Sequence, residues 1–246
     1  MTARPHASAL TFCGTDLLLY GAGYLYLPDH KMLVVSDLHL EKGAAQSSGL
    51  PLPAYDTDDT VRRLESACAR LSPKTCLFLG DSFHNEATAF RLPERIQDKL
   101  SALATQRQFI WVTGNHDPNI PAFLPGESCN SYISDGLVFC HEMTQQDKII
   151  AENSSDDTGS AYGYIFGHFH PKARMRLPAK NVTGRCFIHD NRALIMPAFG
   201  AFTGGLNILD PAIQSLLNKP QTVHFCYEEQ IYSYPVSQKH FMTGYE

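Results

Sequence analysis

Residue types that bind metal ions follow five short apolar runs of the sequence. Seven such residues stand just after those runs: Asp37, His39, Asp81, Asn115, His141, His168 and His170. Open α/β sheets hold their ligands at the carboxyl ends of the strands, so five strands with these endings would bring the residues to one place. Carboxylate and imidazole groups without thiolate favour Mn, Fe or Zn over Mg or Ca. The sequence therefore predicts one metal-binding cluster.

The local spacing supports this interpretation. Asp37 and His39, like His168 and His170, are two positions apart, which places both side chains on one side of an extended segment. A single Asp or His after a strand is more often a helix cap or an ordinary turn residue. The tetrad Gly114–Asp117 is different, because average residue usage produces it on the order of once in a thousand chains of this length. Two metals held in this way activate a hydroxide and stabilise both oxygens of a displacement at phosphorus.

Two residues beside the predicted ligands are candidates for catalysis. His84 lies three positions after Asp81, where it would contact substrate or orient a ligand, or else be a histidine of a surface loop. Asp117 would fix the tautomer of His116, or else be an ordinary turn aspartate before Pro118.

Three further segments have two interpretations each. Lys172, Arg174 and Arg176 alternate after His170, so on an extended segment they would form a track for a phosphate backbone, or else a solvated strand face. The glycine-rich segment Gly200–Gly205 would present backbone amides to a phosphate, or else form a structural turn. The polar stretch Glu142–Tyr162 predicts a surface loop, with a lid as the alternative.

Apolar periodicity predicts the elements that position these residues. The expected strands are Leu17–Tyr20, Tyr24–Leu27, Met32–Val35, Thr75–Leu79, Phe109–Val112, Leu137–Cys140, Tyr164–Phe166, Arg185–Ile188 and Ala193–Met196. Helices are expected after Asp56, a candidate N-cap, and over Pro93–Thr105. The alternation of strand and helix predicts an α/β sheet, and the later runs predict a second, more antiparallel sheet. No linker or repeat divides the chain, so residues 1–246 are expected to form a single domain.

The composition fits a globular protein of enzyme size. Apolar residues make up 43% and charged residues 18% of the 246 residues, which excludes a disordered chain. A net charge of −5 argues against a protein that coats nucleic acid by bulk electrostatics. The seven cysteines form no Cys-x-x-Cys pair, so neither a disulfide framework nor a zinc ribbon is expected. The sequence shows no signal-like apolar segment and no run of the ~20 apolar residues that span a membrane. The chain is therefore expected to be cytoplasmic, with reduced thiols and no membrane contact.

The order of these motifs resembles the calcineurin-like metallophosphoesterase superfamily. The pattern is D-x-H at Asp37–His39, G-D at Gly80–Asp81, G-N-H-D at Gly114–Asp117, a strand-ending His141, and G-H-x-H at Gly167–His170. Longer segments resemble a narrower family, the ligase-associated DNA damage response endonucleases of bacteria. These segments are Leu38–Gly43, Gly80–His84, Gly167–Pro171 and Pro197–Asn207.

The resemblance implies a four-layer α/β/β/α sandwich, with two mixed sheets flanked by helices and two divalent metals at the sheet ends. Mn is the implied metal, with Fe or Zn as alternatives. The first metal would be held by Asp37, His39, Asp81 and His170, and the second by Asp81, Asn115, His141 and His168. Asp81 would bridge the two metals, and His116 would lie beside the phosphate as general acid or transition-state stabiliser.

The resemblance also implies an endonuclease that cuts single-stranded or unpaired DNA during repair, in association with an ATP-dependent DNA ligase, an exonuclease and a helicase. The ligand set itself predicts hydrolysis, whereas the DNA substrate follows from the resemblance. A phosphomonoesterase or a small-molecule phosphodiesterase would use the same residues. A non-catalytic binding scaffold is less favoured, because no ligand position has decayed. The sequence leaves the oligomeric state open.

Overall fold

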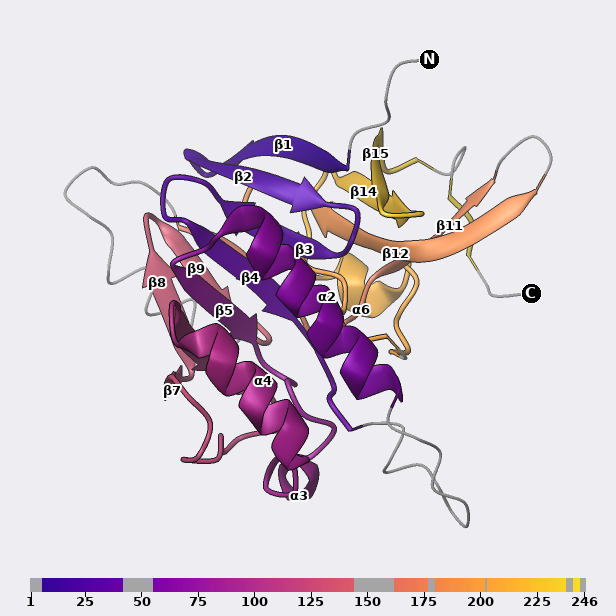
Figure 1. Cartoon of the computed structure of the whole chain (residues 1–246). Helices are drawn as coiled ribbons and strands as arrows, with labels where there is room; N and C mark the ends of the chain where they lie inside the picture. Colours follow the sequence, from indigo (N-terminus) through magenta and orange to yellow (C-terminus); the bar gives the residue numbers. More distant parts are fainter. Residues whose placement is uncertain are drawn as a thin grey trace, which may run out of the picture.

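Two β-sheets packed face to face form the centre of the protein (Figure 1). The computed structural model describes residues 6–41, 55–143, 162–176, 180–201, 203–237 and 241–243. Side chains from both sheets fill the space between them, including Val34 and Leu79 from the first sheet and Phe139 and Ile165 from the second. Apolar burial between two sheets is the main force that holds such a sandwich together.

The first sheet has seven strands in sequence order. They are β1 (Ala7–Phe12), β2 (Thr15–Tyr20), β3 (Tyr24–Leu27), β4 (Met32–Ser36), β5 (Thr75–Leu79), β6 (Gln108–Val112) and β7 (Glu127–Cys129). Strands β1 to β4 pair antiparallel, and β4 to β7 pair parallel. The strands predicted at β2 to β6 are confirmed, and the parallel part of the sheet fits the predicted alternation of strand and helix. Strands β4 to β6 are apolar on both faces because both faces are covered.

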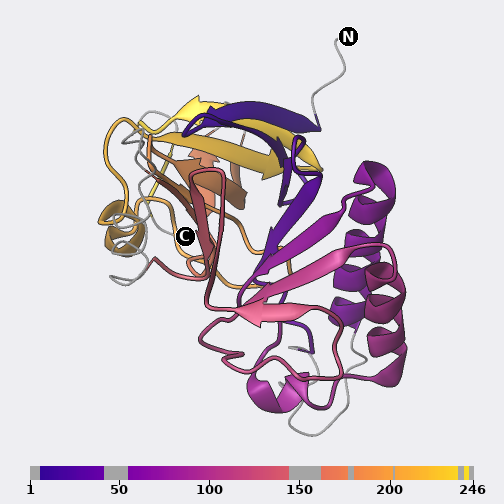
Figure 2. The same cartoon turned by 90° about the vertical axis from the view of Figure 1, so that its left-hand side faces the viewer.

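Helices α2 (Tyr55–Leu71), α3 (Glu86–Ala89) and α4 (Glu94–Ala104) follow the strands of this sheet, and α2 and α4 cover its outer face (Figure 2). Val61, Leu64 and Cys68 recur at helical spacing on α2 and pack into the same core cluster as Phe78 of β5. The expected N-cap role of Asp56 is wrong, because Asp56 lies within the first turn of α2. A carboxylate there still suits the positive end of the helix dipole.

The second sheet has eight strands. Seven lie in the order β15 (Gln230–Pro235), β14 (Thr222–Tyr227), β12 (Asn181–His189), β13 (Ala193–Ile195), β10 (Gly163–Phe166), β9 (Leu137–Cys140) and β8 (Ser131–Ser134), and β11 (Lys172–Arg176) pairs with β12. Only the β9–β10 and β10–β13 pairs are parallel. The predicted predominance of antiparallel pairs is therefore confirmed.

The outer face of the second sheet packs against α6 (Pro211–Gln214) and the segment around it, including Ile208, Ile213 and Leu217. The predicted sandwich of two mixed sheets flanked by helices is confirmed. Within the described residues, however, the layer on this side contains a single short helix. None of the helices in the described ranges is long and apolar enough to cross a membrane.

Asp190 stabilises the turn between β12 and β13, two strands that pair antiparallel. Its buried carboxylate accepts backbone N–H bonds from Arg192 (2.7 Å), Ala193 (2.7 Å) and Asn218 (2.6 Å). It therefore ties the hairpin to the loop that precedes β14.

We expect Asp190→Ala to lower the free energy of unfolding by about 2–4 kcal/mol, because it leaves three partly buried N–H groups without their acceptor. Urea unfolding followed by circular dichroism measures the change. Asn191→Ala, at the exposed neighbouring position, is the control and should be near neutral. Equal stability of the two variants would show that Asp190 does not hold the turn.

Candidate metal centre

The carboxyl ends of five strands meet at one edge of the sandwich. In the first sheet, Ser36 pairs with Leu79 in register and Leu79 with Val112, so the residues that follow β4, β5 and β6 leave the sheet side by side. In the second sheet, Phe166 pairs in register with Cys140, so the residues that follow β10 and β9 also leave the sheet side by side. The side chains of all seven predicted ligands come together there, within the distances that follow.

Asp37, His39 and His170 form the first group. Asp37 Oδ1 lies 3.1 Å from His170 Nε2, and the Nε2 atoms of His39 and His170 are 3.2 Å apart. Asp37 and His39 are buried, and His170 is half-buried. The three side chains can hold one metal ion, because their donor atoms all lie within 4.8 Å of one another.

Asp81, His141 and His168 form the second group, and their donor atoms also lie within 4.8 Å of one another. Asn115 joins them. Its Oδ1 is 2.8 Å from His141 Nε2 and 3.1 Å from His168 Nδ1. The amide oxygen of Asn115 therefore completes a second set of nitrogen and oxygen donors.

Asp81 lies between the two groups. Its Oδ2 is 3.4 Å from His141 Nε2 in the second group and 4.0 Å from His39 Nε2 in the first. Donor atoms that share an ion at ~2.0–2.2 Å must themselves be a few ångströms apart, and these contacts fit that requirement. The donor set thus fits two divalent ions with Asp81 reaching both.

The backbone at these strand ends adopts a conformation that L-residues usually avoid. Five of the seven residues have positive φ angles: Asp37 (52°), His39 (45°), Asp81 (45°), His168 (67°) and His170 (46°). Such conformations cost free energy and persist where surrounding contacts impose them, which is common at functional sites. Glycine is required at Gly80, because a Cβ there would meet the ring of His141.

Burial and mutual pairing shift the pKa values of the donors in the metal-free protein. Burial alone opposes ionisation of Asp81, but the hydrogen bond and charge of His141 outweigh it and lower the pKa of Asp81 to about 2. Burial also disfavours the charged form of His141, yet Asp81 and Asp37 raise its pKa to about 9. For Asp37, pairing with His170 overcomes burial and lowers the pKa. The carboxylates are therefore ionised, and a metal must displace the proton of His141.

Asp117 supports the loop of Asp81 and makes no contact that orients His116. Its buried carboxylate accepts backbone N–H bonds from Asp81 (3.0 Å), Ser82 (2.6 Å), Phe83 (3.2 Å) and Gly114 (2.9 Å). The expected role of Asp117 in fixing the tautomer is therefore corrected. Asp117 is a positioning residue that joins the loops after β5 and β6.

The backbone carbonyl of His84 orients His116 instead. His116 Nδ1 lies 2.9 Å from that oxygen, so Nδ1 carries the proton and donates it, leaving Nε2 directed at the cleft, 3.9 Å from Asp81 Oδ2. The His116 side chain is 43% exposed, as a group that meets a substrate must be. The ring of His84 lies 6.2 Å from that of His116. The main chain of the loop containing His84 thus helps to form the site.

Three supporting contacts have no signal in the sequence pattern. Ser36 Oγ donates a 2.5 Å hydrogen bond to Asp37 Oδ2, and Glu142 Oε2 lies 3.9 Å from His168 Nε2. Arg63 of α2 donates to the carbonyl of Phe199 (2.7 Å) with its guanidinium 4.4 Å from the centre of that ring. Ser36 and Glu142 could have been suspected only because they are next to the predicted ligands Asp37 and His141 in the chain. Nothing near Arg63 in the sequence points to its role.

The glycine-rich segment after β13 serves as a structural turn. The N–H of Gly200 donates to the carbonyl of Asp37 (3.1 Å) and that of Phe199 to Ser36 (2.7 Å). These bonds brace the strained turn at Asp37 from the second sheet. Phe202 of this segment and residues 144–161 of the expected loop or lid lie outside the described residues.

The alternating basic residues lie on one face of β11, as the sequence predicts. Ala173 and Met175 are buried on the opposite face, whereas Lys172 and Arg174 are half-buried and Arg176 is exposed. Lys172 Nζ also donates to the carbonyl of Thr203 (3.0 Å). Their contact with a phosphate backbone stays a prediction.

A family model, the calcineurin-like phosphoesterase, matches residues 30–170, which is more than half of the chain and includes all seven predicted ligands. The chain belongs to this family. Its members use a binuclear divalent metal site, and the two groups of donors described above provide for one. The protein is thus a metal-dependent phosphoesterase, and the predicted superfamily is confirmed.

The fold is shared with a solved structure. The Pseudomonas putida nuclease MPE has a TM-score of 0.68 at 21% identity, over 94% of this chain and 100% of that one. At this identity, the likeness shows the fold alone. The phosphoesterase Yfce from E. coli has a TM-score of 0.39 at 14% identity, over 84% of this chain and 99% of that one. This similarity is too low to show a shared fold. No curated protein matches the sequence.

We expect Asp117→Ala to weaken metal binding by about 10- to 100-fold, because partners that orient ligands typically contribute this much. Asp117→Asn keeps one acceptor oxygen and should lose less. Titration calorimetry with Mn²⁺ measures both. Asp98→Ala, on the exposed surface of α4, is the matched control. Wild-type affinity in a folded Asp117→Ala protein would contradict the positioning role.

Proposed function

We propose that the protein is a binuclear-metal phosphodiesterase that acts as an endonuclease on single-stranded or unpaired DNA during repair. The observation that carries the proposal is the position of Asp81 between two groups of histidine and aspartate donors. In this proposal, Asp37, His39, Asp81 and His170 hold one metal, and Asp81, Asn115, His141 and His168 hold the other. The metals are most simply Mn²⁺, because the donor set is nitrogen and oxygen without sulfur, which Fe or Zn would also accept.

The metals, when bound, supply a nucleophile of lowered pKa and positive charge on the phosphate oxygens. The residues of the chain do the rest. Asp81 neutralises part of the repulsion between two close cations. His116, held by the carbonyl of His84, presents Nε2 to the cleft beside the metals. In its protonated form, this nitrogen donates a proton to the leaving oxygen or stabilises the charge that develops there.

The choice of a DNA diester rests on three supports. The motifs resemble those of the ligase-associated DNA damage response endonucleases, the fold is that of a protein described as a nuclease, and basic residues follow His170 on one face of β11. That family also suggests a cytoplasmic repair enzyme that works with an ATP-dependent DNA ligase, an exonuclease and a helicase.

A phosphomonoesterase or small-molecule phosphodiesterase is the alternative, since the metals would serve either. A scaffold without catalysis is the least favoured, because all seven donors are in place.

The proposal predicts that the protein with Mn²⁺ hydrolyses bis-aryl phosphate faster than mono-aryl phosphate and nicks circular single-stranded DNA more than duplex. Asp81→Ala should abolish both activities and loosen both metals, because the shared carboxylate is lost. Metal analysis of the purified proteins accompanies the assays, with Asp98→Ala as control. A preference for mono-aryl phosphate would favour the monoesterase, and activity of Asp81→Ala with full metal content would refute the bridging role.

His116→Ala should retain both metals and slow DNA cleavage by roughly 10²–10⁴-fold, the usual contribution of a positioned acid or base. An activated aryl leaving group needs no proton, so hydrolysis of bis-aryl phosphate should suffer less. Steady-state kinetics on the two substrates measure the difference. His30→Ala, which removes a histidine at the distant β3–β4 turn, is the control. Equal losses on both substrates would show charge stabilisation in place of proton transfer, and loss of metal would show that His116 is a ligand.

A further inference from the structure

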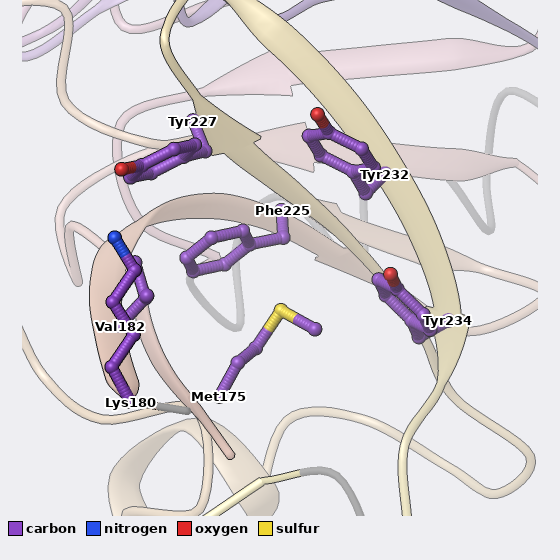
Figure 3. Close-up of a pocket in the computed structure, with 7 residues that line it drawn as sticks. All are labelled: Met175, Lys180, Val182, Phe225, Tyr227, Tyr232 and Tyr234. Carbon is purple, nitrogen blue, oxygen red and sulfur yellow. The ribbon is translucent and has the colours of Figure 1, made fainter. Parts of the chain in front are cut away.

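A pocket lies on the outer side of the second sheet, and none of the predicted metal ligands lines it. Its volume is about 220 Å³, and its walls are Met175, Lys180, Val182, Phe225, Tyr227, Tyr232 and Tyr234. Figure 3 shows the three tyrosines along the side formed by β14 and β15, with Met175, Val182 and Lys180 opposite. Pockets for drug-sized ligands measure ~300–1,000 Å³, so this one suits a smaller group such as a single flat ring system.

The strand register places four aromatic rings on one face. Phe225 pairs with Tyr232 across the β14–β15 ladder, and residues two apart on each strand share a face, which adds Tyr227 and Tyr234. The rings of Phe225 and Tyr227 are nearly parallel, with an angle of 14° and centres 6.5 Å apart. The tyrosines are half-buried, so their ring faces remain accessible from the pocket. Such surfaces bind flat aromatic ligands by stacking.

Lys180 is the charged residue in the lining. Its Nζ lies 5.8 Å from the centre of the Tyr227 ring, and the Lys180 side chain is exposed. The ammonium group thus lies over the Tyr227 ring, in the same lining as Tyr232 and Tyr234, where it would meet an anionic substituent of a ring stacked on the aromatic residues. An aromatic ring that carries a negative charge is the chemistry of a nucleotide, with its base on the tyrosines and its phosphate at Lys180.

The pocket is within reach of the metal centre. Met175 lies on β11 and follows His170 by five residues along the chain, and five residues span at most ~18 Å. A single strand whose scissile phosphate lies at the metals therefore reaches the pocket with a nucleotide a short distance along the chain. Duplex DNA cannot insert a paired base into such a pocket without opening.

We propose that this pocket binds one unpaired nucleotide of the DNA substrate beside the cleavage site. The inference rests on the proposed function and makes it more specific, because it explains how the enzyme selects single-stranded DNA. A free nucleotide has the same chemistry as a nucleotide of the strand, and the experiment separates the two sources.

The test compares Tyr227→Leu and Lys180→Gln with two matched controls. Tyr132→Leu changes a half-buried tyrosine on β8 at the other end of the sheet, and Lys74→Gln an exposed lysine before β5. Binding of a fluorescent single-stranded oligonucleotide is measured by anisotropy, and hydrolysis is measured on the oligonucleotide, a dinucleotide and bis-aryl phosphate. We expect Tyr227→Leu to weaken oligonucleotide binding about 5- to 100-fold, the range for loss of one stacking platform. KM for the oligonucleotide should rise in parallel, while kinetics on the two short substrates stay as in the wild type.

Three other outcomes would overturn the proposal, and a fourth would separate it from the proposed function. Unchanged oligonucleotide binding in Tyr227→Leu and Lys180→Gln would exclude the pocket from the DNA path. Equal losses on bis-aryl phosphate would show damage to the metal centre instead. A mononucleotide that binds the wild type but not Tyr227→Leu, with oligonucleotide binding unchanged, would assign the pocket to a free nucleotide. If the wild type cleaves none of the three substrates but binds the oligonucleotide through Tyr227, the proposed function fails and the pocket assignment stands.

Discussion

The position of Asp81 is the constraint on which the site depends. A carboxylate that serves two groups of donors must be placed to within a fraction of an ångström, yet it lies on a left-handed turn that an aspartate does not favour. The four N–H bonds to Asp117 hold that turn, and Gly80 provides the space for the ring of His141. The strain at the turn is therefore offset by a buried acceptor from the next loop.

The same logic applies to the first group of donors, where the support comes from the other sheet. The turn at Asp37 accepts backbone hydrogen bonds from Phe199 and Gly200, which follow β13 of the second sheet. Arg63 from α2 holds Phe199 in turn. The two sheets therefore do more than share a core, because each one fixes a backbone that presents ligands from the other.

The electrostatics of the cleft explain why the histidines and carboxylates alternate around it. Buried carboxylates need positive partners, and in the metal-free protein the protonated His141 is one for both Asp81 and Asp37. Metal ions take over this role when they bind, and the histidines then act as neutral donors. His116 lies at the rim of the cleft, where its partly exposed side chain can meet a substrate.

The sequence alone predicted which seven side chains come together at the cleft, because they stand just after apolar runs whose length and composition predict strands. It also determined the α/β class, since strands β4, β5, β6, β9 and β10 are apolar along most of their length. Strands β1, β7, β8 and β15 escaped prediction, because polar residues interrupt them at the edges of the sheets. Strand β14 escaped it although its residues are mostly buried, and β11 was expected only as an extended segment with alternating basic residues. The roles of Asp117 and of the His84 carbonyl required the folded structure. Their partners are 32–36 positions away in the chain, and hydrogen bonds between loops leave no periodic signal.

The aromatic pocket likewise exists only after β11, β12, β14 and β15 have paired, because periodicity shows which face of a strand is buried and not which strand lies beside it.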